Sequence, residues 1–158
     1  MPYAPHSVFE PPADNTIIWR FISFQKFVSM ITNSSLYFTR LDKLGDPFEG
    51  LYSKARIQFD EKVYDSYDSS EASEYGKSVM RWMHLDPYKQ RRTSFVNCWH
   101  MSEYETELLW SRYSFMDGGV AIQSTFERLK SCLNIPHAVY IGKIKYMSWE
   151  TEATPIGN

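Results

Sequence analysis

Apolar residues near the start of the chain change from a strand pattern to a helix pattern. Residues 17–21 form a β-branched and aromatic run, which is typical of a strand. Ser23 then stands where the N-cap of a helix would be. The next apolar residues recur at the spacing of one helical face, and they are Phe24, Phe27, Val28 and Ile31. We predict a strand followed by an amphipathic helix that ends at residues 33–34.

Four later segments have the apolar and β-branched content of short strands: 36–39, 93–99, 120–123 and 138–146. Helical spacing predicts two helices within residues 52–92, with a soft polar connection at residues 65–75. Asp86 before Pro87 is typical of a cap and the first turn of a further short helix. Strands and helices therefore succeed one another along most of the chain.

Two capping boxes predict where the later helices begin. Ser102 with Glu105, and Ser124 with Glu127, have the spacing at which a side-chain oxygen and a carboxylate satisfy the first helical amides. We expect the first helix to carry Leu108, Leu109, Trp110 and Tyr113, and the second to carry Phe126, Leu129 and Leu133.

These elements predict the α+β class: a single domain in which a mixed or antiparallel sheet of about five short strands is flanked by helices. A doubly wound parallel sheet is disfavoured because no Gly-rich turn of Rossmann type follows a strand. The boundaries we predict are an extended, proline-rich arm at residues 1–15, the domain at residues 16–150 and a tail at residues 151–158.

Residues 44–50 read as a loop that holds one shape, and its core is the motif Asp46, Pro47, Phe48, Glu49 and Gly50. Pro47 fixes φ, and Asp46 can accept backbone amides within the turn. Phe48 is expected to anchor the loop in the core, and Glu49 to pair with a cation such as Arg40 or Lys43. A general acid and base, or a metal bound through oxygen, is the other reading of the two carboxylates.

Composition and charge narrow the class of protein. Hydrophobic residues make up 43% of the chain and aromatic residues 16%, which is typical of a globular domain rich in rings. The net charge of -2 disfavours a nucleic-acid binder held by electrostatics. The cluster Lys89, Arg91 and Arg92 is a weak footprint for a phosphate-bearing partner, and a solvated helix end explains it better.

The cellular compartment expected from the sequence is the cytoplasm. Residues 1–14 contain no basic leader followed by an apolar run, and no segment reaches the length of a membrane span. The two cysteines, Cys98 and Cys132, lack a CxxC spacing and are predicted to be buried free thiols.

His100 is the histidine with the best placement for chemistry, because it follows the predicted strand 93–99. Two-residue spacing would put Cys98 and His100 on the same face, as a thiol–histidine pair would need. A packed cysteine and a hydrogen-bonded histidine is the simpler interpretation. A zinc site is not predicted, since His84 and His137 add no recognisable ligand spacing.

Six blocks together resemble an uncharacterised bacterial domain-of-unknown-function family marked by the DPFEG loop. They are residues 19–21 (WRF), 36–38 (LYF), 46–50 (DPFEG), 97–100 (NCWH), 109–113 (LWSRY) and 118–122 (GGVAI). The resemblance covers about Trp19 to Tyr146, and Gly45 departs from the asparagine more usual before the aspartate. Members of the family continue into a segment with two glutamates one residue apart, so the resemblance implies that this chain lacks it.

The order of these features also resembles that of ADP-ribosyltransferase toxins, which is a likeness at the level of fold. It implies that Arg20 binds the pyrophosphate of NAD and that Tyr37 or Tyr113 stacks on the nicotinamide, in a bacterial phage-defence or toxin role. The missing glutamate would then complete catalysis, with Glu49 and His100 as the remaining candidates in this chain. The alternative is a non-catalytic interaction or ligand-sensing module that recognises a protein partner.

Overall fold

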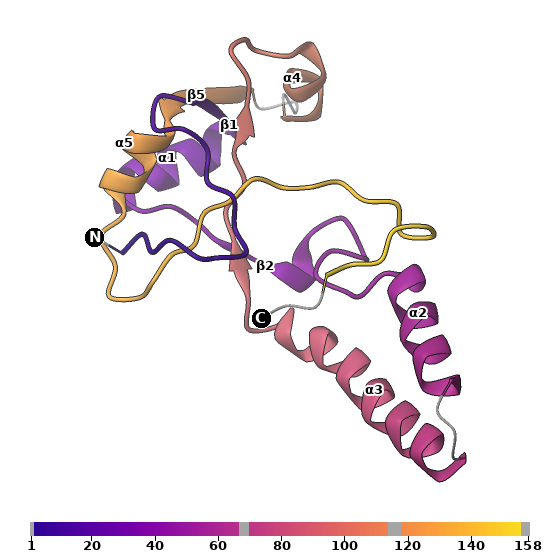
Figure 1. The fold of residues 1–158 in the computed structure, drawn as a ribbon. Coiled ribbons are helices and arrows are strands. Elements are labelled where there is room, and N and C mark those ends of the chain that lie inside the picture. The colour runs from indigo at the N-terminus through magenta and orange to yellow at the C-terminus, as the bar shows by residue number, and fades with distance from the viewer. Residues whose placement is uncertain (1, 67–69, 114–117, 156–158) are drawn as a thin grey trace. The chain divides into compact units, whose positions relative to one another are not determined.

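The computed structural model describes residues 2–66, 70–113 and 118–155 and is a single α+β domain, as predicted (Figure 1). Its residues gather in two compact units. Unit 1 comprises Met1–Tyr37 and Asn97–Ile144, and unit 2 comprises Phe38–Val96 and Lys145–Asn158. The strand pairs are antiparallel in both units, within the range predicted from the sequence.

Unit 1 is organised around strand β1 (Ile17–Ser23), which lies between β4 (His100–Met101) and β5 (Gly119–Thr125). β1 and β5 pair over seven residues, with Arg20 opposite Ile122. Helix α5 (Phe126–Cys132) follows β5, and the capping residue Thr125 accepts a hydrogen bond from the amide of Arg128. The buried apolar core of the unit is Ile18, Trp19, Phe21, Ile22, Phe126, Leu129 and Leu133.

Helix α1 (Phe24–Asn33) forms where it was predicted, with Ser23 as its N-cap. Ser34 ends it in the left-handed conformation, at a φ of 47°. The apolar face predicted from the sequence is largely exposed, because Phe24, Val28 and Ile31 each keep about half of their surface in solvent. Helix α1 is therefore amphipathic without burying its apolar side chains.

Three predicted strands are wrong in extent. Of residues 36–39 only Thr39 enters β2 (Thr39–Arg40), and of residues 93–99 only β3 (Phe95–Val96) is a strand. Residues 138–146 contribute a single bridge, between Val139 and Tyr3. The partner of that segment is the proline-rich arm, which lacks the amide donors for a continuous ladder.

Unit 2 contains the β2–β3 ladder, the 3-10 turn η1 (Leu41–Lys43) and two long helices. Helices α2 (Lys54–Asp65) and α3 (Ser70–Gln90) run antiparallel, because Asp60 meets His84 and Asp65 meets Lys77 (Figure 1). Residues 70–75, predicted as part of a soft connection, are helical. The rest of that predicted connection includes residues 67–69, which lie outside the described residues.

Several predicted helix starts are also wrong. Pro87 lies inside α3 and does not begin a new helix; the amide of Arg91 bonds to its carbonyl, so the helical turn continues. Helix α4 (Glu107–Tyr113) begins after Thr106, whose hydroxyl accepts the amide of Leu109, and the predicted cap Ser102 accepts the amide of Tyr104 in a turn. The cap of α5 is likewise Thr125 and not Ser124.

Gly76 of α3 lies directly against the ring of Tyr64 on α2. A Cβ atom at Gly76 would lie 2.1 Å from a ring carbon of Tyr64. We expect Gly76→Ala to lower the free energy of unfolding by about 1–2 kcal/mol, since the ring must move and the gain in helix propensity offsets only part of the loss. Urea denaturation of both proteins measures this difference.

The double variant Gly76→Ala/Tyr64→Ala is the control. Without the Tyr64 ring, adding the methyl group should no longer destabilise the protein, which a double-mutant cycle would detect. An equal effect of Gly76→Ala in both backgrounds would show that the ring contact does not set the requirement for glycine.

Candidate functional site

Arg20 lies on β1 with its guanidinium against the segment that precedes β4. Its Nη1 donates to Oδ1 of Asn97 at 3.1 Å and to the carbonyl of Cys98 at 2.7 Å. Its Cζ lies 5.9 Å from the centroid of the Trp99 ring, within the range of a cation–π contact. Arginine at this position therefore joins the central strand to residues 97–99.

The side chain of Asn97 connects the other residues of this arrangement. Its Oδ1 also accepts the indole Nε1 of Trp99 at 2.7 Å, and its Nδ2 donates to the carbonyl of Tyr37 at 2.8 Å. We call Arg20, Tyr37, Asn97 and Trp99 the Arg20 cluster. It brings together three sequence blocks that are far apart along the chain, and sequence reasoning missed Asn97 as the residue that connects them.

Aromatic packing supports the same strand. Trp19 donates its indole Nε1 to the carbonyl of Ser102 at 3.0 Å. The Phe21 and Trp110 rings meet edge to face with centroids 5.3 Å apart. These contacts bury the residues on either side of Arg20 and so restrict the position of its Cα.

The other sequence candidates in unit 1 are placed less favourably for chemistry. Tyr37 belongs to the Arg20 cluster through its backbone carbonyl, and its ring is 74% exposed. Tyr113 ends α4, and its side chain lies outside the described part of the structure. His100 is exposed on β4 opposite Trp19, whereas Cys98 lies outside that strand, so the predicted two-residue strand spacing does not apply.

Cys98 and Cys132 are both exposed, so the prediction that they are buried is wrong. Among residues 2–66, 70–113 and 118–155, no group of three or more His, Cys, Asp and Glu side chains is placed to hold a metal ion. No helix in the described ranges is long and apolar enough to cross a membrane.

The DPFEG loop in unit 2 has the internal bond predicted from its sequence. Oδ1 of Asp46 accepts the amide of Phe48 at 2.8 Å, and Gly50 has a φ of 75° that favours glycine. Phe48 does not anchor the loop in a core as predicted: it is half exposed and lies over Trp149 with ring centroids 4.4 Å apart. Glu49 is partly buried.

Arg91 fixes this loop from the end of α3. Its Nη1 donates to the carbonyl of Pro47 at 2.8 Å and its Nη2 to the carbonyl of Asp46 at 3.3 Å. The residue is only 9% exposed, and its buried Nε has no hydrogen-bond partner. The interpretation of Arg91 as part of a solvated helix end is therefore wrong, because its guanidinium is used inside the unit.

Arg40, one predicted partner of Glu49, pairs instead with Asp42 at 2.6 Å. The hydrogen bond from Arg40 is the main reason why the pKa of Asp42 lies below its ordinary value. A carboxylate with a lowered pKa stabilises the fold above its unfolded pKa, and this contribution is lost as the pH falls.

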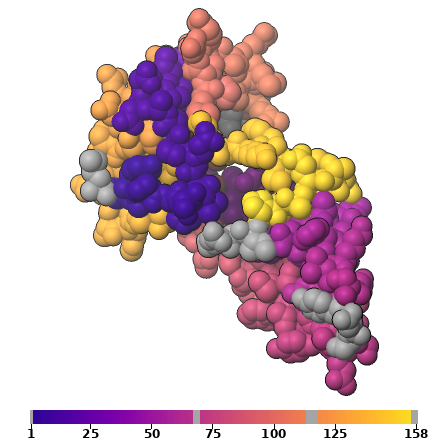
Figure 2. All heavy atoms as spheres, in the orientation of Figure 1, coloured from indigo at the N-terminus to yellow at the C-terminus, as the bar shows by residue number. Residues whose placement is uncertain are grey.

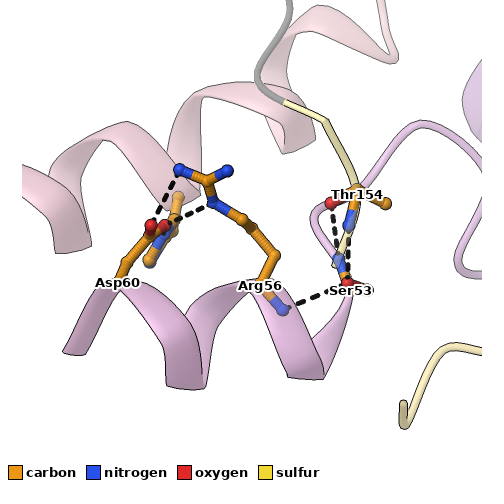
Figure 3. Close-up of polar contacts among 5 residues, drawn as sticks. Ser53, Arg56, Asp60 and Thr154 are labelled. Atoms are coloured by element: carbon orange, nitrogen blue, oxygen red, sulfur yellow. Dashed lines mark hydrogen bonds and ion pairs between the residues drawn. The ribbon is translucent and has the colours of Figure 1, made fainter. Parts of the chain in front are cut away.

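A second polar cluster lies between α2 and α3. Asp60 is 5% exposed and binds Arg56 at 2.8 Å and Nε2 of His84 at 3.0 Å. Figure 3 shows Arg56 turned along α2 toward Asp60. The Tyr52 ring meets the His84 ring edge to face with centroids 5.6 Å apart. Sequence reasoning missed this cluster, although the four-residue spacing of Arg56 and Asp60 was visible.

An open cavity of about 140 Å³ adjoins this cluster and is lined by Glu61, Tyr64, Asp65, Lys77, Met80, Arg81 and His84. Lys77 is already paired with Asp65 at 2.5 Å, and the lining carries both signs of charge. These features do not select a class of ligand. We therefore assign the Asp60 cluster a role in holding the two helices together.

Ser53 holds Thr154 at the start of α2 (Figure 3), and in Figure 2 the yellow part of the chain lies against purple residues of unit 2. The Ser53 hydroxyl accepts the amides of Arg56 and Thr154 and donates to the carbonyl of Glu152 at 2.7 Å. Lys54 and Glu150 add an exposed ion pair at 2.7 Å. The same serine thus caps the helix and ties a distant segment of the chain to it.

Comparison of the chain with models of protein families, with curated proteins and with solved structures finds no match. Assignment of a function therefore depends on the geometry of the chain itself.

The Arg91 contacts predict how the DPFEG loop responds to substitution. Arg91→Gln removes the fork that reaches both loop carbonyls, so we expect faster amide hydrogen exchange at residues 46–51. Arg92→Gln is the matched control, because Arg92 is the neighbouring residue and is exposed. Equal rates of amide hydrogen exchange in the wild type and Arg91→Gln would show that Arg91 does not hold the loop in place.

The Asp60 contacts predict a strong effect on stability. Asp60→Ala leaves Arg56 and His84 without their shared acceptor in a largely buried position, and should lower the free energy of unfolding by about 3 kcal/mol. Asp65→Ala removes an exposed carboxylate from the same helix and should change it by less than about 1 kcal/mol. Denaturant unfolding compares the two variants, and similar losses would contradict a special role for Asp60.

Proposed function

We propose that unit 1 binds NAD at the Arg20 cluster and that the protein is an ADP-ribosyltransferase-like domain with a role in bacterial defence or as a toxin. The observation that carries this proposal is the network centred on Asn97. It holds an arginine, an indole ring and the backbone of an exposed tyrosine together.

Each part of the Arg20 cluster suits one part of a dinucleotide. A guanidinium presents planar donors that fit phosphate oxygens, and its charge favours a pyrophosphate. The Tyr37 ring, exposed beside the cluster, offers a face on which a nicotinamide or adenine can stack. The Arg20 cluster would supply binding of NAD. The family resemblance places the catalytic glutamate in a segment that follows Tyr146, the last residue that the resemblance covers.

A non-catalytic interaction or ligand-sensing module is the alternative, and one observation favours it. Arg20 Nη1 donates to two protein groups, Oδ1 of Asn97 and the carbonyl of Cys98, which is the pattern of an arginine that supports a fold. In that case the cluster shapes the surface, and the DPFEG loop held by Arg91 is the element that meets a partner.

Tyr37→Ala tests the NAD proposal without disturbing the network, because Asn97 bonds only to the backbone carbonyl of Tyr37. Loss of a stacking ring should weaken NAD binding roughly tenfold, as expected for about 1–3 kcal/mol per stacked base. Ligand-observed NMR with the full chain measures the affinity. Tyr104→Ala is the control, since that ring is 76% exposed elsewhere in unit 1.

Arg20→Lys separates binding from folding. It keeps the charge but removes the planar fork, so NAD affinity should fall while the circular dichroism spectrum stays native. If the folded wild-type chain does not bind NAD, or if Tyr37→Ala and Arg20→Lys bind it as well as the wild type, the interaction module is the better proposal.

A further inference from the structure

Helix α3 has the reverse of the usual distribution of polar and apolar residues. The face toward α2 carries small and polar residues, among them Ser73, Gly76, Lys77 and His84. The opposite face carries the exposed side chains of Tyr75, Val79 and Trp82, whereas Met80 lines the cavity beside α2. A helix normally buries its apolar face against the rest of the protein, so this arrangement indicates that another surface covers α3.

The exposed face is a continuous stripe centred on Trp82. Tyr75, Val79 and Trp82 follow one another at intervals of four and three residues, which places them in one row along the helix. Trp82 is 66% exposed and Tyr75 is 74% exposed, and Leu85 beside them is also exposed. α2 lies beside α3 (Figure 1), and the residues of α3 that bond to it are Lys77 and His84.

Charges of opposite sign stand at the two ends of this stripe. Glu71 lies in the first turn of α3 and Lys89 in the last. Lys89 is on the same face as Trp82, because its Nζ lies 6.0 Å from the centroid of that ring. Glu71 therefore stands at one end of the stripe and Lys89 at the other, where Asp86 accepts a hydrogen bond from Gln90.

We propose that α3 packs antiparallel against α3 of a second copy of this chain. A two-fold axis through the middle of the stripe makes the surface self-complementary, as an isologous interface requires. Glu71 of one copy then lies opposite Lys89 of the other, Tyr75 opposite Leu85, and Val79 beside Trp82. The antiparallel orientation also opposes the two helix dipoles.

The extent of the stripe suits a reversible dimer. From Glu71 to Lys89 the helix is about 27 Å long, at 1.5 Å for each residue. The two Trp82 side chains near its centre and the two Tyr75 side chains nearer its ends are of the residue types that dominate binding energy at interfaces. A single pair of helices covers less than the roughly 800 Å² per partner of a standard stable interface, so association should depend on protein concentration.

Sedimentation velocity of the full chain over a range of concentrations tests the proposal. The wild type should change from monomer to dimer as concentration rises. Trp82→Ala should raise the dimer dissociation constant about 30-fold or more, as for a central aromatic anchor. Because Trp82 is mostly exposed, the circular dichroism spectrum should not change.

Two controls decide whether the α3 stripe is the interface. Ile31→Ala alters the exposed apolar face of α1 and should leave association unchanged. Lys89→Glu should weaken the dimer roughly tenfold by placing two acidic groups together, and the double variant Glu71→Lys/Lys89→Glu should restore it to within about threefold.

Three results would overturn the proposal. A wild-type chain that stays monomeric at every concentration would do so, as would association that Trp82→Ala leaves unchanged. Failure of the double charge reversal to restore what Lys89→Glu weakens would exclude the antiparallel arrangement. None of these readouts involves NAD, so their outcome is independent of the function proposed for unit 1.

Discussion

Burial of strand β1 on both faces is the constraint on which unit 1 depends. Ile18, Trp19, Phe21 and Ile22 are buried, and β4 and β5 pair with its two edges. A shift of its register by one residue would move Arg20 into a position that a buried apolar residue now fills. Arg20 is part of the same strand, so the packing of its neighbours places its guanidinium against Asn97 and Trp99. The candidate site is built on the least mobile type of scaffold.

Unit 2 is held together by charges in places where apolar side chains are more usual. Arg91 is nearly buried against two carbonyl groups of the DPFEG loop, and Asp60 is buried between Arg56 and His84. Such groups contribute little net stability compared with apolar packing, but each requires one geometry of its partners. The side of α3 that faces α2 is therefore mainly polar, and Tyr75, Val79 and Trp82 lie on its exposed side.

The α+β class and several helices and strands could be predicted from local sequence patterns. The strand at residues 17–21, helix α1 with its Ser23 cap, the strand at residues 120–123 and the internal bond of Asp46 are all confirmed. Strand lengths could not be predicted, because a ladder needs a partner with free amides. At residues 97–99 side-chain bonds of Asn97 replace the ladder. Helix starts were wrong by one to four residues where two capping residues competed.

The sequence by itself determined the strand at residues 17–21, helix α1 with its Ser23 cap and the place of the DPFEG turn. These properties arise from contacts between residues close along the chain, so the local sequence is enough to predict them. Only the tertiary structure decided that Asn97 joins Arg20 to Tyr37, that Arg91 clamps a loop 44 residues away and that Asp60 meets His84. Such pairings depend on how distant segments pack. The identity of a polar residue does not indicate which distant residue it will bond to.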